Sequence, residues 1–193
     1  MLLNADILKR KFGQGAVYGD FVASGEPEGH RPRWDERYAQ LSLDESQTSL
    51  VGGFTREMNV LCLTGTWCGD CALQGSAMAR IAEANPGAIH LRYVPRHEEH
   101  ADLITKASIN GGFRVPVTWF MSEDFEPVAV FGDRTLSRYR SMALKQIGAE
   151  LANVTAPPPS DPVREVLREV LDLFERVQLL LRLSPRLRER HGD

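Results

Sequence analysis

Long apolar runs are missing from this sequence, and so is an excess of positive charge. No stretch approaches the roughly 20 apolar residues that a membrane-spanning helix needs. The N-terminus becomes polar within a few residues and lacks the apolar segment of a secretory signal peptide. The 26 acidic residues slightly outnumber the 23 lysine and arginine residues, so no global basic field favours nucleic acid. We therefore expect a cytoplasmic protein that binds neither membranes nor nucleic acids.

Cysteine is also scarce, with only three residues in the chain. Cys62, Cys68 and Cys71 lie within ten positions of one another. Three cysteines cannot build a framework of several disulfides. In a reducing compartment, such a cluster indicates redox chemistry or metal binding rather than structural cross-linking.

The residues that are present suit a globular domain with a normal core, because 42% of them are hydrophobic and 25% are charged. Residues 5–12 and 34–43 have partly helical apolar patterns, and the periodicity becomes regular from residue 59 onward. In chain order we expect a strand over 59–63, a helix over 72–84, a strand over 89–93, a helix over 98–109, hairpin strands over 117–121 and 128–131, and a helix over 136–151.

This order predicts an α/β sandwich with a central mixed sheet flanked by helices. The first strands should be parallel because a helix connects them, and the hairpin should add antiparallel strands. We assign residues 1–54 to an N-terminal helical extension, 55–155 to the α/β domain, 156–161 to a proline-rich linker, and 162–193 to a C-terminal amphipathic helix and tail.

The run Trp67-Cys68-Gly69-Asp70-Cys71 stands between the predicted buried strand and the following helix. A cysteine at a helix N-terminus meets unpaired backbone N–H groups and the positive end of the helix dipole, which both favour a thiolate. Two intervening residues allow the second thiol to reach back and resolve a mixed disulfide. We therefore predict that Cys68 is the nucleophile and Cys71 the resolving thiol.

Three other interpretations of this motif stay open. The pair could be half of a zinc site completed by Cys62 and a distant histidine, although there is no second CxxC. It could consist of two inert cysteines. The domain could also be a protein-interaction module without significant redox turnover. We expect no metal and no cofactor beyond the redox-active disulfide.

Two segments resemble the thioredoxin superfamily. Residues 60–71, which end in the CxxC run, are similar to the active-site strand and loop of thioredoxins, where Trp-Cys-Gly-Pro-Cys is usual. Phe113-Arg114-Val115-Pro116-Val117-Thr118 resembles the segment that carries the family's cis-proline. The resemblance covers roughly residues 55–152 and is strongest to a bacterial branch of thioredoxin-like proteins.

The resemblance implies a thioredoxin-like fold and a thiol–disulfide oxidoreductase. Trp67, Gly69, Asp70, Val115 and Pro116 would form the surroundings of the dithiol, with a cis Val115–Pro116 bond. The substrates would be protein or low-molecular-weight disulfides, a reductase of unknown identity would supply electrons, and the role would be cell redox homeostasis.

Two positions depart from the family pattern. Cys62 stands where thioredoxins usually carry a buried aspartate that assists proton transfer, and we expect it to be a small core residue. Asp70 replaces the usual proline. Its negative charge should disfavour the Cys68 thiolate, unless it is a solvated acid at the helix start with little effect.

Residues outside the motif suggest two further contacts. Arg114 could steady the thiolate or an acidic substrate group, or be a plain surface residue. Residues 162–183 carry an apolar helix face that needs a partner. We expect this helix to form a homodimer, with docking onto its own domain or covering a partner as the alternatives.

Overall fold

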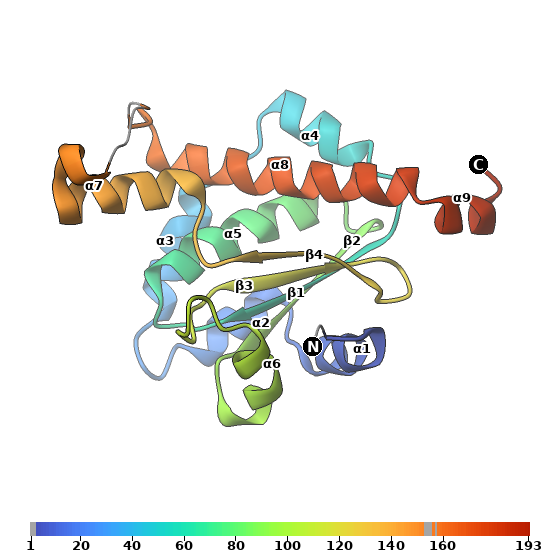
Figure 1. Cartoon of the computed structure of the whole chain (residues 1–193), viewed down its shortest axis with the longest axis horizontal. Coiled ribbons are helices and arrows are strands. Elements are labelled where there is room, and N and C mark those ends of the chain that lie inside the picture. The colour runs from blue at the N-terminus through green and yellow to red at the C-terminus, as the bar shows by residue number, and fades with distance from the viewer. Residues whose placement is uncertain (1–2, 153–155, 157) are drawn as a thin grey trace.

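The computed structural model describes residues 3–152, 156 and 158–193 (Figure 1). Residue 157 of the predicted linker and residues 153–155 of the predicted domain lie outside the described residues. The elements are α1 (Ala5–Gln14), α2 (Tyr18–Ser24), α3 (Arg31–Gln40), α4 (Glu45–Gly52), β1 (Met58–Thr64), α5 (Gly69–Ala84), β2 (Ile89–Pro95), the 3₁₀ helix η1 (Glu98–His100), α6 (Ala101–Lys106), β3 (Val117–Met121), β4 (Pro127–Gly132), α7 (Leu136–Ala152), α8 (Pro162–Leu183) and α9 (Pro185–His191).

Strand β1 lies inside a four-stranded sheet of order β2-β1-β3-β4. All its residues are buried, as expected for a strand covered on both faces. It runs parallel to β2 and antiparallel to β3, and β3 pairs with β4 as an antiparallel hairpin. The predicted mixed sheet is therefore confirmed.

One predicted helix is shorter than expected. Composition predicts a helix over 98–109, but the helical segment ends at Lys106. Asn110 and Gly111 both adopt positive φ, a conformation that turns the chain out of a right-handed helix. Ile109 instead bridges Gly112 across this turn.

Helices cover both sides of the sheet (Figure 1). Helices α5 and α8 lie side by side over one face, while α1 and α6 lie on the other. Lys11 of α1 joins Asp102 of α6 through an ion pair of 2.9 Å. Among the residues described, no helix is both long enough and apolar enough to cross a membrane.

The N-terminal segment closes the β2 edge of the sheet. Ala16 exchanges two backbone hydrogen bonds with Tyr93 of β2, each of 2.9 Å. The Tyr93 ring stacks on Phe21 of α2 and meets Trp34 of α3 edge-on. A Cβ on Gly75 of α5 would lie 2.6 Å from the Trp34 ring, so this close approach of α3 to α5 requires glycine.

Helix α8 buries its apolar face within the same chain. Phe174 is fully buried and packs edge-on against Phe120 of β3, with ring centroids 5.0 Å apart. Gln178 accepts hydrogen bonds from the backbone N–H groups of Thr55 and Arg56. The apolar residues of this face that are buried are Val166, Leu167, Val170, Leu171, Phe174, Val177 and Leu181.

This packing removes the reason for expecting a homodimer, which was that the apolar face of α8 needs a partner. The spacing of apolar residues in 162–183 predicts that the face is covered, and the covering surface is α5 and the sheet of the same chain. Of the three alternatives, docking onto its own domain accounts for the face. A homodimer through α8 would need a different surface of the helix.

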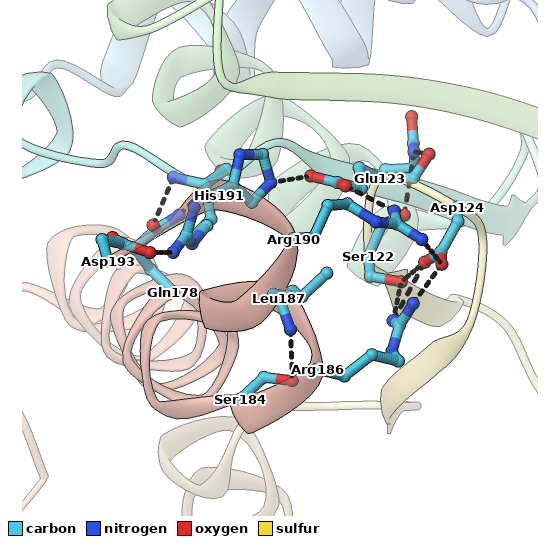
Figure 2. Close-up of polar contacts among 12 residues, drawn as sticks. Ser122, Glu123, Asp124, Gln178, Ser184, Arg186, Leu187, Arg190, His191 and Asp193 are labelled. Carbon is cyan, nitrogen blue, oxygen red and sulfur yellow. Dashed lines mark hydrogen bonds and ion pairs between the residues drawn. The ribbon is translucent and has the colours of Figure 1, made fainter.

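The C-terminal tail is fastened to the turn between β3 and β4 (Figure 2). Arg190 of α9 pairs with Glu123 at 2.6 Å, and His191 contacts the same carboxylate at 2.8 Å. Arg186 pairs with Asp124. These arginines are therefore engaged by acidic residues of the chain itself.

Candidate active site

The strand–turn–helix connection places Cys68 at the N-cap of α5. Buried β1 ends at Thr64, and the helix begins at Gly69 after a short turn. The Cys68 sulfur accepts a hydrogen bond from the backbone N–H of Cys71 at 3.3 Å. The helix end thus directs one of its free N–H groups at this sulfur, as the sequence predicts.

The two thiols of the motif differ in exposure and in pKa. Cys68 is partly exposed, and the pKa of its thiol is lowered to about 7, chiefly by a hydrogen bond from the Cys71 thiol and then by the Cys71 backbone N–H, against the opposing effect of burial. Cys71 is buried, and burial followed by its hydrogen bond to Cys68 raises its pKa well above the ordinary value. One thiol is thus accessible and easily ionised, while the other is shielded and protonated.

The proline segment lies beside the dithiol, because Val117 at the start of β3 pairs with Leu63 near the end of β1. The Val115–Pro116 peptide bond is cis, which confirms the prediction for this bond. The Val115 carbonyl oxygen lies 3.8 Å from the Cys68 sulfur. The Val115 side chain is buried. The Arg114 guanidinium pairs with Asp133 at 3.4 Å.

Asp70 is held by two arginines that sequence reasoning missed. Arg134 donates to one carboxylate oxygen at 2.6 Å, and Arg138 donates to the other at 2.8 Å. The Asp70 side chain is only 11% exposed, so the interpretation as a solvated acid is wrong. Its charge raises the pKa of Cys68, as predicted, but the hydrogen bonds to the sulfur outweigh this effect.

Cys62 lies in the core, as expected from its position in the central strand. Its side chain is fully buried, and burial raises the pKa of its thiol to about 12. This thiol is therefore protonated at neutral pH. It cannot act as the ionised base that the sequence resemblance gives to a carboxylate at this position.

The loop before the nucleophile is held by α3, a contact that local sequence patterns do not reveal. The indole N–H of Trp34 donates to the Thr66 carbonyl at 2.8 Å. Arg33 donates to the Trp67 carbonyl, also at 2.8 Å. The Trp67 ring is 46% exposed and lies beneath the Arg96 guanidinium at 4.9 Å. The N-terminal extension thus supports the active-site loop directly.

Comparison with solved structures agrees with this fold. A protein of unknown function from Pseudomonas aeruginosa has a TM-score of 0.59 and 18% identity, over 89% of this chain and 99% of that chain. An HIV epitope-scaffold protein has a TM-score of 0.55 and 18% identity, over 83% of this chain and 94% of that chain. No curated protein sequence matches the chain.

The family itself is shown by a sequence model described as thioredoxin, which matches residues 18–143. That match includes the active-site loop and the cis-proline segment, and it begins inside the segment expected to be an N-terminal extension. The chain belongs to the thioredoxin family.

Proposed function

We propose that this protein is a thiol–disulfide oxidoreductase in which Cys68 attacks disulfides and Cys71 resolves the mixed disulfide. The observation that carries the proposal is the pairing of a partly exposed Cys68 with a pKa of about 7 and a buried, protonated Cys71 that hydrogen-bonds to it. The thiolate is the reactive form of a cysteine, so this pair has one attacking and one waiting thiol at neutral pH.

The reaction begins when the Cys68 thiolate attacks one sulfur of the substrate disulfide. A bond forms between Cys68 and that sulfur, and the other substrate sulfur leaves as a thiolate that takes a proton. Cys71 then loses its proton and attacks the Cys68 sulfur, which releases the second substrate thiol. Two electrons have passed to the substrate, and the protein holds a Cys68–Cys71 disulfide until an external thiol reductant restores it.

Formation of the mixed disulfide helps to activate Cys71. In the reduced protein, both the hydrogen bond to Cys68 and the negative charge of Cys68 raise the Cys71 pKa. Both effects disappear when Cys68 becomes covalently bound, so the Cys71 pKa falls at the step that needs its thiolate. This fall in the Cys71 pKa compensates in part for the absence of a carboxylate at position 62.

The proposal also includes a reducing, cytoplasmic location and a reductase partner of unknown identity. The cysteine usage supports the location, since the three cysteines cluster at one site instead of forming structural cross-links. The substrates would be protein or low-molecular-weight disulfides.

An insulin-reduction assay with dithiothreitol tests the proposal. Wild-type protein should accelerate insulin precipitation, and Cys68→Ser should abolish the acceleration. Cys71→Ser should instead accumulate mixed disulfides that reductant releases, because the resolving step is lost. If the wild-type protein gives no acceleration and Cys71→Ser traps nothing, the domain is an interaction module rather than an oxidoreductase.

A further inference from the structure

A cavity of about 400 Å³ opens beside the start of α5, directly after the nucleophile. Its walls come from four helices: α3, α5, α7 and the first turn of α8. The residues that line it are Arg33, Arg37, Gly69, Asp70, Leu73, Arg138, Pro162 and Val163. It therefore lies where both terminal extensions meet the active-site helix.

The cavity is positively charged although the chain as a whole carries a net charge of −3. Three guanidinium groups line it, and Asp70 is the one acidic residue among the lining residues. Both oxygens of Asp70 are already bound, one by Arg138 and one by Arg134. Positive charge thus exceeds negative charge, and the excess comes from Arg33 and Arg37.

Both of these arginines keep donors available for a ligand. Within the described part of the chain, Arg33 donates through one terminal nitrogen to the Trp67 carbonyl. Arg37 donates through one terminal nitrogen to Gln40. A guanidinium has five N–H groups in a planar fork that matches a carboxylate, so each retains the means to bind an anion.

The position of the cavity connects it to the chemistry. Gly69 follows Cys68 in the chain, and a Cβ at Gly69 would meet no atom within 4 Å. The residue next to the nucleophile therefore faces open space at the cavity. Leu73 and Val163 supply an apolar portion, so the lining combines a few charged groups with apolar contact, as small-molecule sites do.

We propose that this cavity holds a carboxylate-bearing part of a low-molecular-weight disulfide while Cys68 attacks its sulfur. The proposal rests on the oxidoreductase function proposed above and adds its substrate class. A small molecule is favoured over an acidic protein because the volume is that of a small-ligand site and helices wall it on several sides. In the reaction, Cys68 bonds to the near sulfur, the far sulfur leaves as a thiolate and takes a proton, and the carboxylate stays on the arginines.

The test compares three small disulfides with the fully reduced full-length protein. Oxidised glutathione is a net anion, bis(2-hydroxyethyl) disulfide is neutral, and cystamine is a dication. Stopped-flow measurement of intrinsic tryptophan fluorescence, to which Trp67 next to Cys68 contributes, is supported by acid quenching and thiol labelling and gives the second-order rate of Cys68 oxidation for each disulfide. We expect the anion to react fastest and cystamine slowest, with the difference shrinking as salt is added.

The variant Arg37→Gln should lower the ratio of the glutathione rate to the neutral-disulfide rate about fivefold, the effect of one exposed charge-assisted contact. The control Arg10→Gln/Arg176→Gln removes two charges at exposed positions away from the cavity and should keep the wild-type ratio. Using a ratio separates anion binding from any general change in reactivity.

The outcomes separate the two proposals. If the reduced protein reacts with none of the three disulfides and does not reduce insulin, the oxidoreductase function fails. If it reacts with all three at a ratio that Arg37→Gln leaves unchanged, the function stands and the anion site is refuted. An equal fall in the ratio for Arg37→Gln and for the control also refutes the site, because overall charge would then explain the preference.

Discussion

The sharpest prediction concerns the ionisation of Cys68 and its dependence on Cys71. The Cys68 pKa of about 7 lies about two units below the ordinary value of 9.0. Two units correspond to about 2.7 kcal/mol in favour of the thiolate. At pH 7 about half of the Cys68 thiols should be ionised, compared with about 1% for an unperturbed thiol.

The largest single cause of this shift is the hydrogen bond from the Cys71 thiol. Cys71→Ala removes that donor but keeps the backbone N–H of residue 71, so the Cys68 pKa should rise toward its ordinary value without reaching it. Cys71→Ser keeps a hydroxyl donor and should give an intermediate value. The two substitutions are nearly matched in size, which isolates the hydrogen bond from packing.

The assay is the rate of iodoacetamide alkylation between pH 5 and 10, followed alongside thiolate absorbance at 240 nm. Cys62 should not contribute, because its pKa is raised to about 12 by burial. The pKa of Cys68 is lower in the folded protein than in the unfolded chain, so ionisation of Cys68 stabilises the reduced fold. The full stabilisation is present above about pH 9 and is lost as the pH falls through 7. A wild-type midpoint near 9, or equal midpoints in wild type and Cys71→Ala, would refute the reasoning.

Three further predictions use the same structure. Asp70→Asn should lower the pKa of Cys68 by about half a unit to one unit, because it removes a nearby negative charge and the acidic partner of Arg138. A rise in the alkylation midpoint would contradict this. Phe174→Ala should lower the free energy of unfolding, measured by urea denaturation, by about 3–5 kcal/mol. The control Leu183→Ala, at a position that is 74% exposed, should lower it by less than about 0.5 kcal/mol. Similar small losses for both variants would mean that α8 is not docked. Arg190→Ala should lower the free energy of unfolding slightly at pH 7, as urea unfolding would show. The part of this loss that comes from Glu123 should fade as the pH falls through the lowered pKa of Glu123, which that arginine depresses, while the pair with Asp124 persists. A loss that does not change with pH would exclude the Glu123 ion pair as a cause.

The parts of the site predicted from sequence are those that depend on neighbouring residues. A short apolar strand, a CxxC run and a helix pattern fix the order strand, turn, helix, and this order alone places Cys68 at a helix N-terminus. The burial of Cys71 follows from the same pattern, because Cys71 lies in the first turn of a helix that packs on the sheet. The local pattern was sufficient here because the hydrogen bonds that favour the Cys68 thiolate come from Cys71, three positions away.

The parts that sequence reasoning missed are contacts between residues far apart in the chain. Asp70 was expected either to act alone or to be solvated, because its partners, Arg134 and Arg138, lie 64 and 68 positions away. Trp34 was assigned to a helix, but nothing in the local pattern identifies the Thr66 carbonyl as its acceptor. Periodicity shows that a side chain is covered and does not show what covers it, and the same limit explains the homodimer expectation for α8.

The two terminal extensions act on one element of the fold, the helix that carries the dithiol. Helix α3 packs on one flank of α5 and α8 on the other, and these are among the most extensive helix contacts of the described chain. Each extension also contributes to the surroundings of Cys68: α3 binds the carbonyls of the active-site loop, and α8 begins at the cavity next to Gly69. Of the arginines that line this cavity, two belong to α3 and the third to α7, so the strands and α5 alone would present no guanidinium there. Helix α3 therefore acts on the same thiol in two ways: it restrains the loop that presents Cys68, and it supplies the excess charge of the proposed anion site, whereas α8 completes the wall of the cavity.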